Sequence, residues 1–215
     1  MKEYLYIIFI FVAFLSSLWA YRLDILHYKV IAIVMLLDLL LEISANWLVA
    51  RYYSNIWVYN IALLEEFWLY AFYYLLILKY RWARRVIRTW LFVLPLAWLG
   101  YTVCLVGIDR WSSYLPVAGS IFTVLMSAVY YYQMLTAEKL VPLRTSFEFW
   151  IATALIIFFA CTLPFFGMLH YLTVILRVLA KRGISPLQII NIIFYSIVTY
   201  AFLCRISIRR SWQSS

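Results

Sequence analysis

Four carboxylic acids lie inside long apolar stretches of this 215-residue chain, and their chemistry is the most specific that it offers. Asp38 and Glu42 fall in one stretch, and Glu65 and Glu66 fall in the next. An acid is costly to place in hydrocarbon, so acids inside membrane helices usually mark an ion, proton or ligand site. The sequence therefore directs attention first to the two helices that carry these side chains.

The first two acids belong to a polar stripe that also contains Asn46. Asp38, Glu42 and Asn46 follow one another at intervals of four residues. A helix has 3.6 residues per turn, so each step turns by only ~40° and the three side chains share one face. Such a face is costly against lipid, and we expect it to point into a helix bundle or a wet cavity.

The second two acids are adjacent, so they point ~100° apart on a helix. Glu66 shares its face with Tyr59, Tyr70 and Tyr73, whereas the face of Glu65 is mostly apolar. We therefore predict that Glu66 faces the interior. Glu65 is a secondary candidate that either extends toward the headgroups or is neutral.

Glu42 and Glu66 are predicted to lie at similar depth. Glu42 is about eight residues, or ~12 Å, from the end of its helix, and Glu66 is about ten residues, or ~15 Å, from the start of the next. The short loop between these helices makes them antiparallel neighbours, with Asn46 and Asn60 placed above the two acids. Close carboxylates in a low dielectric cannot both be charged without a counter-charge, so a proton or a cation is expected there.

Other polar residues complete the predicted pocket, and a simpler interpretation stays open. Asn191 in the last apolar run, together with Ser120 and Thr123, can contribute polar groups. Arg51 and Arg177, at the ends of their runs, are the nearest basic residues able to reach inward. Alternatively, the acids are protonated or hydrogen-bonded groups that only hold helices together.

The composition identifies lipid as the main solvent of the chain. Hydrophobic residues make up 67% and charged residues 13%, with a mean hydropathy of +0.93. Soluble domains carry about 25% charged residues. The net charge of +9 comes mostly from short segments between apolar runs, without any nucleic-acid-binding motif.

The cysteines, Cys104, Cys161 and Cys204, all lie in apolar runs, and we expect buried, inert thiols.

Seven apolar runs are long enough to span a bilayer, which takes about 20 residues. The runs are 4–21, 30–50, 56–78, 89–108, 114–136, 147–176 and 186–206. We therefore predict an all-α integral membrane protein, a single seven-helix transmembrane domain over 1–215. The sixth run is too long for a straight span and contains Pro164 and Gly167, which predicts either a kink or a tilted helix. No internal repeat is evident.

Lysine and arginine are unequally divided between the two predicted sides. The side of the N-terminus has 6 and the opposite side has 12. The positive-inside rule then puts the N-terminus outside and the C-terminus in the cytoplasm. Five of the twelve form one basic cluster in the predicted third loop, and they are Lys79, Arg81, Arg84, Arg85 and Arg88. The cluster is predicted to fix the topology first and to bind anionic lipid or a partner second.

Several chemistries find no support in the sequence. The two histidines, His27 and His170, are far apart, so a zinc site is not predicted. No serine or cysteine is arranged with a histidine for nucleophilic catalysis. The seventh run has no lysine for a retinal Schiff base. We therefore predict no metal and no cofactor.

Short segments around the candidate residues resemble a known family. They include Leu41-Glu42-Ile43, Asn60-Ile61, Glu66-Phe67, Phe149-Trp150-Ile151 and the stretch 189–193 around Asn191. They resemble an uncharacterised family of seven-transmembrane proteins of the Bacteroidetes, often encoded beside sensor histidine kinases. The resemblance implies location in the bacterial cytoplasmic (inner) membrane and an association with signalling. Residues 158–161, Phe-Phe-Ala-Cys, depart from the family's pattern in the sixth run.

The leading functional hypothesis is a non-enzymatic sensory or accessory membrane protein. Its acidic pocket would open outward, its basic side would be cytoplasmic, and a partner such as a sensor histidine kinase would read changes in helix packing. One alternative is a small proton- or cation-coupled transporter, because membrane acids also form proton relays. A second alternative is a membrane lipid hydrolase that uses paired carboxylates as general acid and base.

Overall fold

A computed structural model describes most of the chain. The backbone is described over residues 5–21, 25–51, 53–111, 114–137, 143–180 and 186–213. Side chains are described over 6–18, 25–51, 53–111, 114–137, 143–165 and 186–204.

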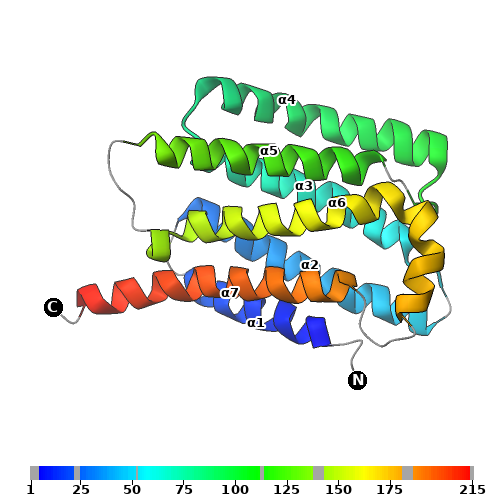
Figure 1. Cartoon of the computed structure of the whole chain (residues 1–215), viewed down its shortest axis with the longest axis horizontal. Helices are drawn as coiled ribbons and strands as arrows, with labels where there is room; N and C mark the ends of the chain where they lie inside the picture. Colours follow the sequence, from blue (N-terminus) through cyan, green and yellow to red (C-terminus); the bar gives the residue numbers. More distant parts are fainter. Residues whose placement is uncertain are drawn as a thin grey trace.

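Every element in the described part of the chain is helical (Figure 1). In chain order these are α1 (Leu5–Tyr21), α2 (Leu26–Ala50), α3 (Ile56–Ile77), α4 (Arg81–Trp98), the π-helical η2 (Leu99–Val106), α5 (Tyr114–Leu135), the short 3₁₀ helix η3 (Leu143–Thr145), α6 (Phe147–Ala180) and α7 (Pro186–Gln213). The predicted all-α class is confirmed.

The described helices have the length and surface of membrane-spanning elements. Six of them are long and apolar enough to cross a bilayer, and α1 adds a shorter apolar helix over Tyr6–Leu18. Large apolar side chains stand on the outer surface, including Phe92 at 77% exposure, Leu96 at 70% and Leu105 at 78%. Water-soluble surfaces rarely carry so much contiguous apolar area, whereas lipid solvates it. The chain is therefore a multi-pass helical membrane protein.

The cysteines require a correction. We expected buried thiols, but Cys104 and Cys161 are exposed on the outside of the bundle and Cys204 is half-buried, all as free thiols. An apolar run can face lipid as readily as protein, because both surroundings are apolar. Hydropathy therefore could not tell a core thiol from a lipid-facing one.

Six of the helices close a ring. α1 packs against α2 and α7, α3 packs against α2 and α5, and α6 packs against α5 and α7. α4 lies outside this ring, against α3 and α5, and forms the upper edge of the molecule in Figure 1. The start of α1 and the end of α7 lie at opposite ends of the bundle. The interior of the ring is thus bordered by helices from both ends of the sequence.

Two helices begin earlier than the apolar runs predicted. α2 begins at Leu26 rather than at residue 30, because Tyr28 is 3% exposed and packs its ring 4.2 Å from that of Phe147 on α6. α4 begins at Arg81 rather than at 89, because Ala83 and Ile87 face inward with no exposure. A hydropathy window cannot detect such polar but amphipathic turns. Only residues 78–80 separate α3 from α4, so the basic cluster lies mostly on a helix and not in a loop.

α6 remains one helix but bends. Its hydrogen-bonded span runs from Phe147 to Ala180 with Pro164 inside it. Figure 1 shows the ribbon of α6 running straight in its yellow part and then turning downward in its gold part. Proline lacks the N–H that would bond to the carbonyl four residues earlier, and its ring displaces that carbonyl. Of the two predicted alternatives, the structure has the kinked helix.

Candidate ligand-binding cavity

A cavity of about 450 Å³ opens in the interior of the ring. Its walls come from α1, α2, α3, α6 and α7, with Trp111 contributed by the segment before α5. Tyr6 and Tyr59, near the first turns of α1 and α3, and Leu187, at the start of α7, all line it. The cavity therefore occupies the half of the bundle where these three helices begin, which is the right-hand end in Figure 1.

The cavity brings together three of the four candidate acids. Asp38 and Glu42 from α2 and Glu66 from α3 line it. All three side chains are half-buried. Glu65, also half-buried, is not among the described residues that line the wall. The difference follows from the ~100° between adjacent helical positions.

Two tyrosines from distant parts of the chain bind two of these acids. The hydroxyl of Tyr6 on α1 donates a 2.7 Å hydrogen bond to Oε2 of Glu42. The hydroxyl of Tyr195 on α7 donates a 3.1 Å hydrogen bond to Oδ2 of Asp38. α2 is therefore joined to both of these helices by a carboxyl–phenol contact at the cavity wall.

A third tyrosine lies behind the acids. Tyr70 is 1% exposed, and its hydroxyl makes no hydrogen bond of good geometry with any described group. The side chains that act on it electrostatically include Glu66, Asp38 and Tyr195, which all line the cavity. Tyr70 therefore belongs to the group of phenols that surround the acids.

α7 contributes a polar stripe to the same wall. Gln188, Asn191 and Tyr195 all line the cavity, at spacings of three and four residues. Asn191 was expected in the pocket, whereas Gln188, Tyr195 and Tyr6 were not considered. The helical spacing from Asn191 would have found Gln188 and Tyr195. Tyr6 carried no such signal, because no other polar side chain shares its turn of α1.

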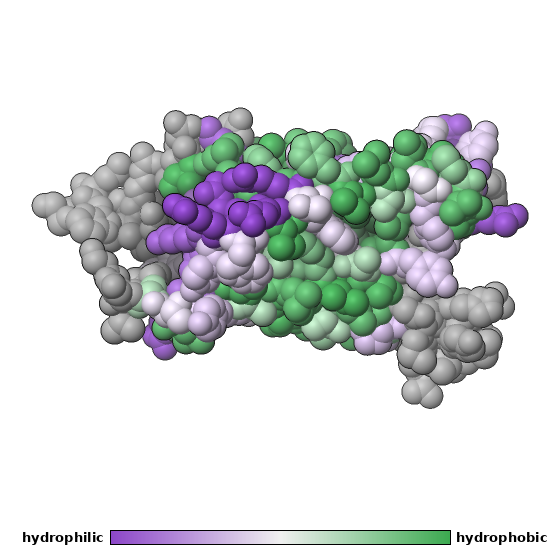
Figure 2. All heavy atoms as spheres, turned by 90° about the horizontal axis from the view of Figure 1, so that it is seen from above, coloured by the Kyte–Doolittle hydropathy of each residue, from purple (hydrophilic) through white to green (hydrophobic). Residues whose placement is uncertain are grey.

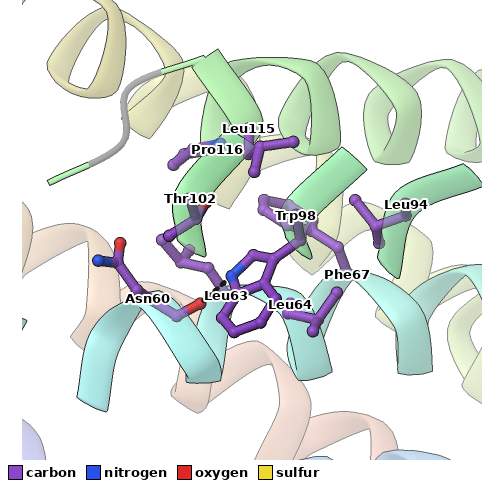
Figure 3. A pocket seen from close by; sticks show the side chains of 9 residues that line it. All are labelled: Asn60, Leu63, Leu64, Phe67, Leu94, Trp98, Thr102, Leu115 and Pro116. Carbon is purple, nitrogen blue, oxygen red and sulfur yellow. Dashed lines mark hydrogen bonds between the residues drawn. The ribbon is translucent and has the colours of Figure 1, made fainter. Parts of the chain in front are cut away.

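Asn60 lies elsewhere than expected, at the junction of α3, α4 and η2 shown in Figure 3. It is 2% exposed, and its Nδ2 donates to the carbonyls of Ile108 at 2.7 Å and Arg110 at 2.9 Å. The indole Nε1 of Trp98 donates a 2.9 Å bond to the backbone carbonyl of Asn60. Asn60 thus anchors the segment after the π-helix and has a structural role.

The remaining candidates bond within their own helices or face outward. Nδ2 of Asn46 donates to the backbone carbonyl of Glu42 at 2.7 Å. Thr123 donates to the carbonyl of Gly119 at 2.9 Å, and Ser120 is fully buried beside it in α5. Arg51 is exposed and stacks over the ring of Trp47 at 5.1 Å. The side chains of His170 and Arg177 lie outside the described residues.

The end of the bundle opposite the cavity carries the basic cluster that was predicted for the third loop. Arg81, Arg84, Arg85 and Arg88 are all exposed along one side of the first turns of α4, and exposed Lys79 precedes them. We call these five residues the basic face. Figure 2 shows α4 from above, with a hydrophilic patch toward the left end within mostly apolar surface.

A hydrogen bond between a histidine and a glutamate lies at this same end, between the first turns of α2 and α6. Nε2 of His27 is 2.8 Å from Oε1 of Glu148, and Ser146 donates to the other carboxylate oxygen at 3.1 Å. His27 precedes the predicted apolar run 30–50, and the structure places it in the first turn of α2. The pair holds two helices together and is separate from the cavity.

The wall of the cavity has acidic groups without basic ones. Among the lining residues that the structure describes, none is a lysine, an arginine or a histidine. Comparison with protein-family models, curated proteins and solved structures finds no match to the chain. The chemistry of the site must therefore be argued from its own residues: it can hold protons or a cationic group between the acids.

Proposed function

We propose that this protein is a seven-span membrane sensor or accessory component that binds a small ligand or protons in its acidic cavity. The short apolar α1 and six longer apolar helices together make seven spans. The excess of lysine and arginine at the end that carries the basic face supports a cytoplasmic location for that end. The N-terminus and the cavity then lie toward the outside, in the outer half of the bilayer.

One observation carries the proposal: three carboxyl groups from α2 and α3 meet phenols from α1 and α7 in one cavity of about 450 Å³. Adding a proton or a cation there changes the strength of the Tyr6–Glu42 and Tyr195–Asp38 contacts. Because these contacts join α2 to α1 and to α7, occupancy of the cavity shifts the balance between helix arrangements.

A change in the helix arrangement has to be detected by a partner at the cytoplasmic end. A sensor histidine kinase is the partner class that the sequence resemblance implies, and the basic face offers it an exposed surface on α4. The ligand binds in the cavity, and the partner binds about 18 Å away along α3. This distance follows from a rise of about 1.5 Å per residue between Glu66 and Leu78.

The test measures thermal stability of the purified protein in nanodiscs across pH. We expect the melting temperature of the wild type to vary with pH, and this variation to shrink in the Glu42→Gln/Glu66→Gln double variant. Glu65→Gln is the matched control, because it removes an acid one position from Glu66 without touching the cavity wall. Equal pH profiles in the wild type and the double variant would refute a titrating acidic site.

A cation- or proton-coupled carrier is a second candidate, supported by the bend in α6. Phe158 and Thr162, which line the cavity, precede Pro164 in α6, so the bend borders the site. Proteoliposomes with a proton gradient separate the two functions. A carrier gives acid-dependent flux that Glu66→Gln abolishes, whereas a sensor gives none.

A further inference from the structure

The cavity is too large and its acids are too dispersed for a bare metal ion. Among the side chains that the structure describes, no three His, Cys, Asp or Glu groups converge closely enough to hold a metal ion. Asp38 and Glu42 are displaced by ~6 Å along α2, at 1.5 Å per residue. The volume of about 450 Å³ is instead typical of sites for small organic molecules.

Aromatic side chains form much of the wall around the acids. Tyr6, Tyr59, Tyr195, Trp111 and Phe158 all line the cavity. The face of an aromatic ring attracts an organic cation, most strongly where water is excluded. Aromatic rings together with carboxylates favour a ligand with a cationic group. The rings also pack against an apolar part of the same ligand.

The rest of the wall is apolar. Leu41, Leu63 and Leu187 line the cavity alongside Ala62. These side chains offer no hydrogen bonds, so they match hydrocarbon rather than a sugar or a hydrated ion. The ligand that fits this wall has one charged end and one apolar part.

The acids retain free acceptor capacity. A carboxylate has about four lone-pair sites, and each described phenol uses one of them on Glu42 and on Asp38. The buried hydroxyl of Tyr70 lies beside Glu66. An ammonium group has N–H donors for these carboxylates, and a tyrosine hydroxyl can support it as a further acceptor.

We propose that the cavity binds a protonated amine attached to an apolar body. This inference rests on the proposed function, because it names the class of ligand for the same site. The ammonium group lies between the carboxylates of α2 and α3, and the apolar part packs against the aromatic rings and leucines of the wall. The carboxylates supply the counter-charge that the low-dielectric interior demands.

The experiment compares two probes that have the same shape and differ in charge. Binding of 2-phenylethylamine and of 2-phenylethanol to the wild type in nanodiscs is measured by calorimetry near neutral pH, where the amine is protonated. We expect the amine to bind about tenfold or more tightly than the alcohol, as a single desolvated cation–π contact would already provide. The triple variant Asp38→Asn/Glu42→Gln/Glu66→Gln loses this preference, and Glu65→Gln keeps it.

The possible results separate this inference from the proposed function. Equal affinity for the amine and the alcohol would refute the inference that the ligand is a cation. The proposal that the cavity binds a small ligand would still stand. A response to sodium, potassium or protons alone, with no amine binding, also overturns it while the sensor proposal stands. If no probe, cation or pH change distinguishes the wild type from the acid variants, both proposals fall. The wild-type comparison needs no variant, and single substitutions of each acid replace the triple variant if it does not fold.

Discussion

The hydroxyl of Tyr6 donates a 2.7 Å hydrogen bond to Oε2 of Glu42, which joins α1 to α2 at the edge of the cavity. Hydrogen bonds between membrane helices contribute about 0.6 kcal/mol on average and up to about 1.7 kcal/mol. We expect Tyr6→Phe to lower the free energy of unfolding by an amount in this range. Reversible unfolding in mixed micelles measures it.

A double-mutant cycle isolates this contact from other effects of the substitution. In the background of Glu42→Ala, Tyr6→Phe should have a smaller effect, because its partner is already gone. Additive effects would show that the phenol stabilises the protein through packing alone.

Asn60 provides a prediction about stability at a position that is not among the described residues of the cavity wall. Asn60→Ala removes the donor to the carbonyls of Ile108 and Arg110 in a buried position. We expect a loss of about 1–3 kcal/mol in unfolding free energy, the usual cost of leaving buried polar groups unpaired. Hydrogen exchange should increase in the segment after the π-helix, where the two carbonyls lose their donor.

Asn46→Ala is the matched control for this prediction. Its amide donates to the carbonyl of Glu42 in its own helix, and the side chain is half-buried. A loss as large as that of Asn60→Ala would argue against the anchoring role of Asn60.

Gly119 allows α5 to approach α3. A Cβ atom added at Gly119 would lie 2.5 Å from Cδ2 and Cε2 of Phe67, which is 2% exposed. We expect Gly119→Ala to cost about 1–3 kcal/mol, as overpacking of a core does. The measurement is the melting temperature in detergent.

Gly100 supplies the comparison, because a Cβ atom there meets nothing within 4 Å. Gly100→Ala should leave the melting temperature nearly unchanged. Combining Gly119→Ala with Phe67→Leu should cost less than the sum of the two changes, since the smaller side chain relieves the clash.

The basic face provides a test of orientation. Replacing its five residues with glutamine reduces the basic count on that side from 12 to 7, against 6 on the other. We expect a mixture of both orientations, because the two sides then carry nearly equal numbers of lysine and arginine and the positive-inside rule favours neither. Reporter fusions at the C-terminus measure the fraction in each orientation. An unchanged orientation would mean that the basic face serves lipid or partner binding instead.

The helical class and the grouping of Glu42 with Glu66 at one cavity could be predicted from sequence, because they follow from hydropathy and from the geometry of two helices joined by a short loop. Hydropathy reports the free energy of moving each residue into lipid, so it locates apolar runs. The fixed rise and turn of a helix place Glu66, rather than Glu65, on an inward face. The same regularities did not locate the first turns of α2 and α4. There Tyr28 and Ile87 are buried by packing against other helices, which hydropathy does not detect.

The amino-acid sequence by itself determined that this chain is helical and lipid-solvated, and that Asp38, Glu42 and Glu66 are candidates for one site. Only the tertiary structure decided that Tyr6 and Tyr195 complete that site and that Asn60 holds a distant segment instead. Tyr195 is 157 positions away from Asp38. Because lipid and protein interior are both apolar, helices choose neighbours through close packing and hydrogen bonds between specific side chains. Those contacts exist only once the ring of helices has closed.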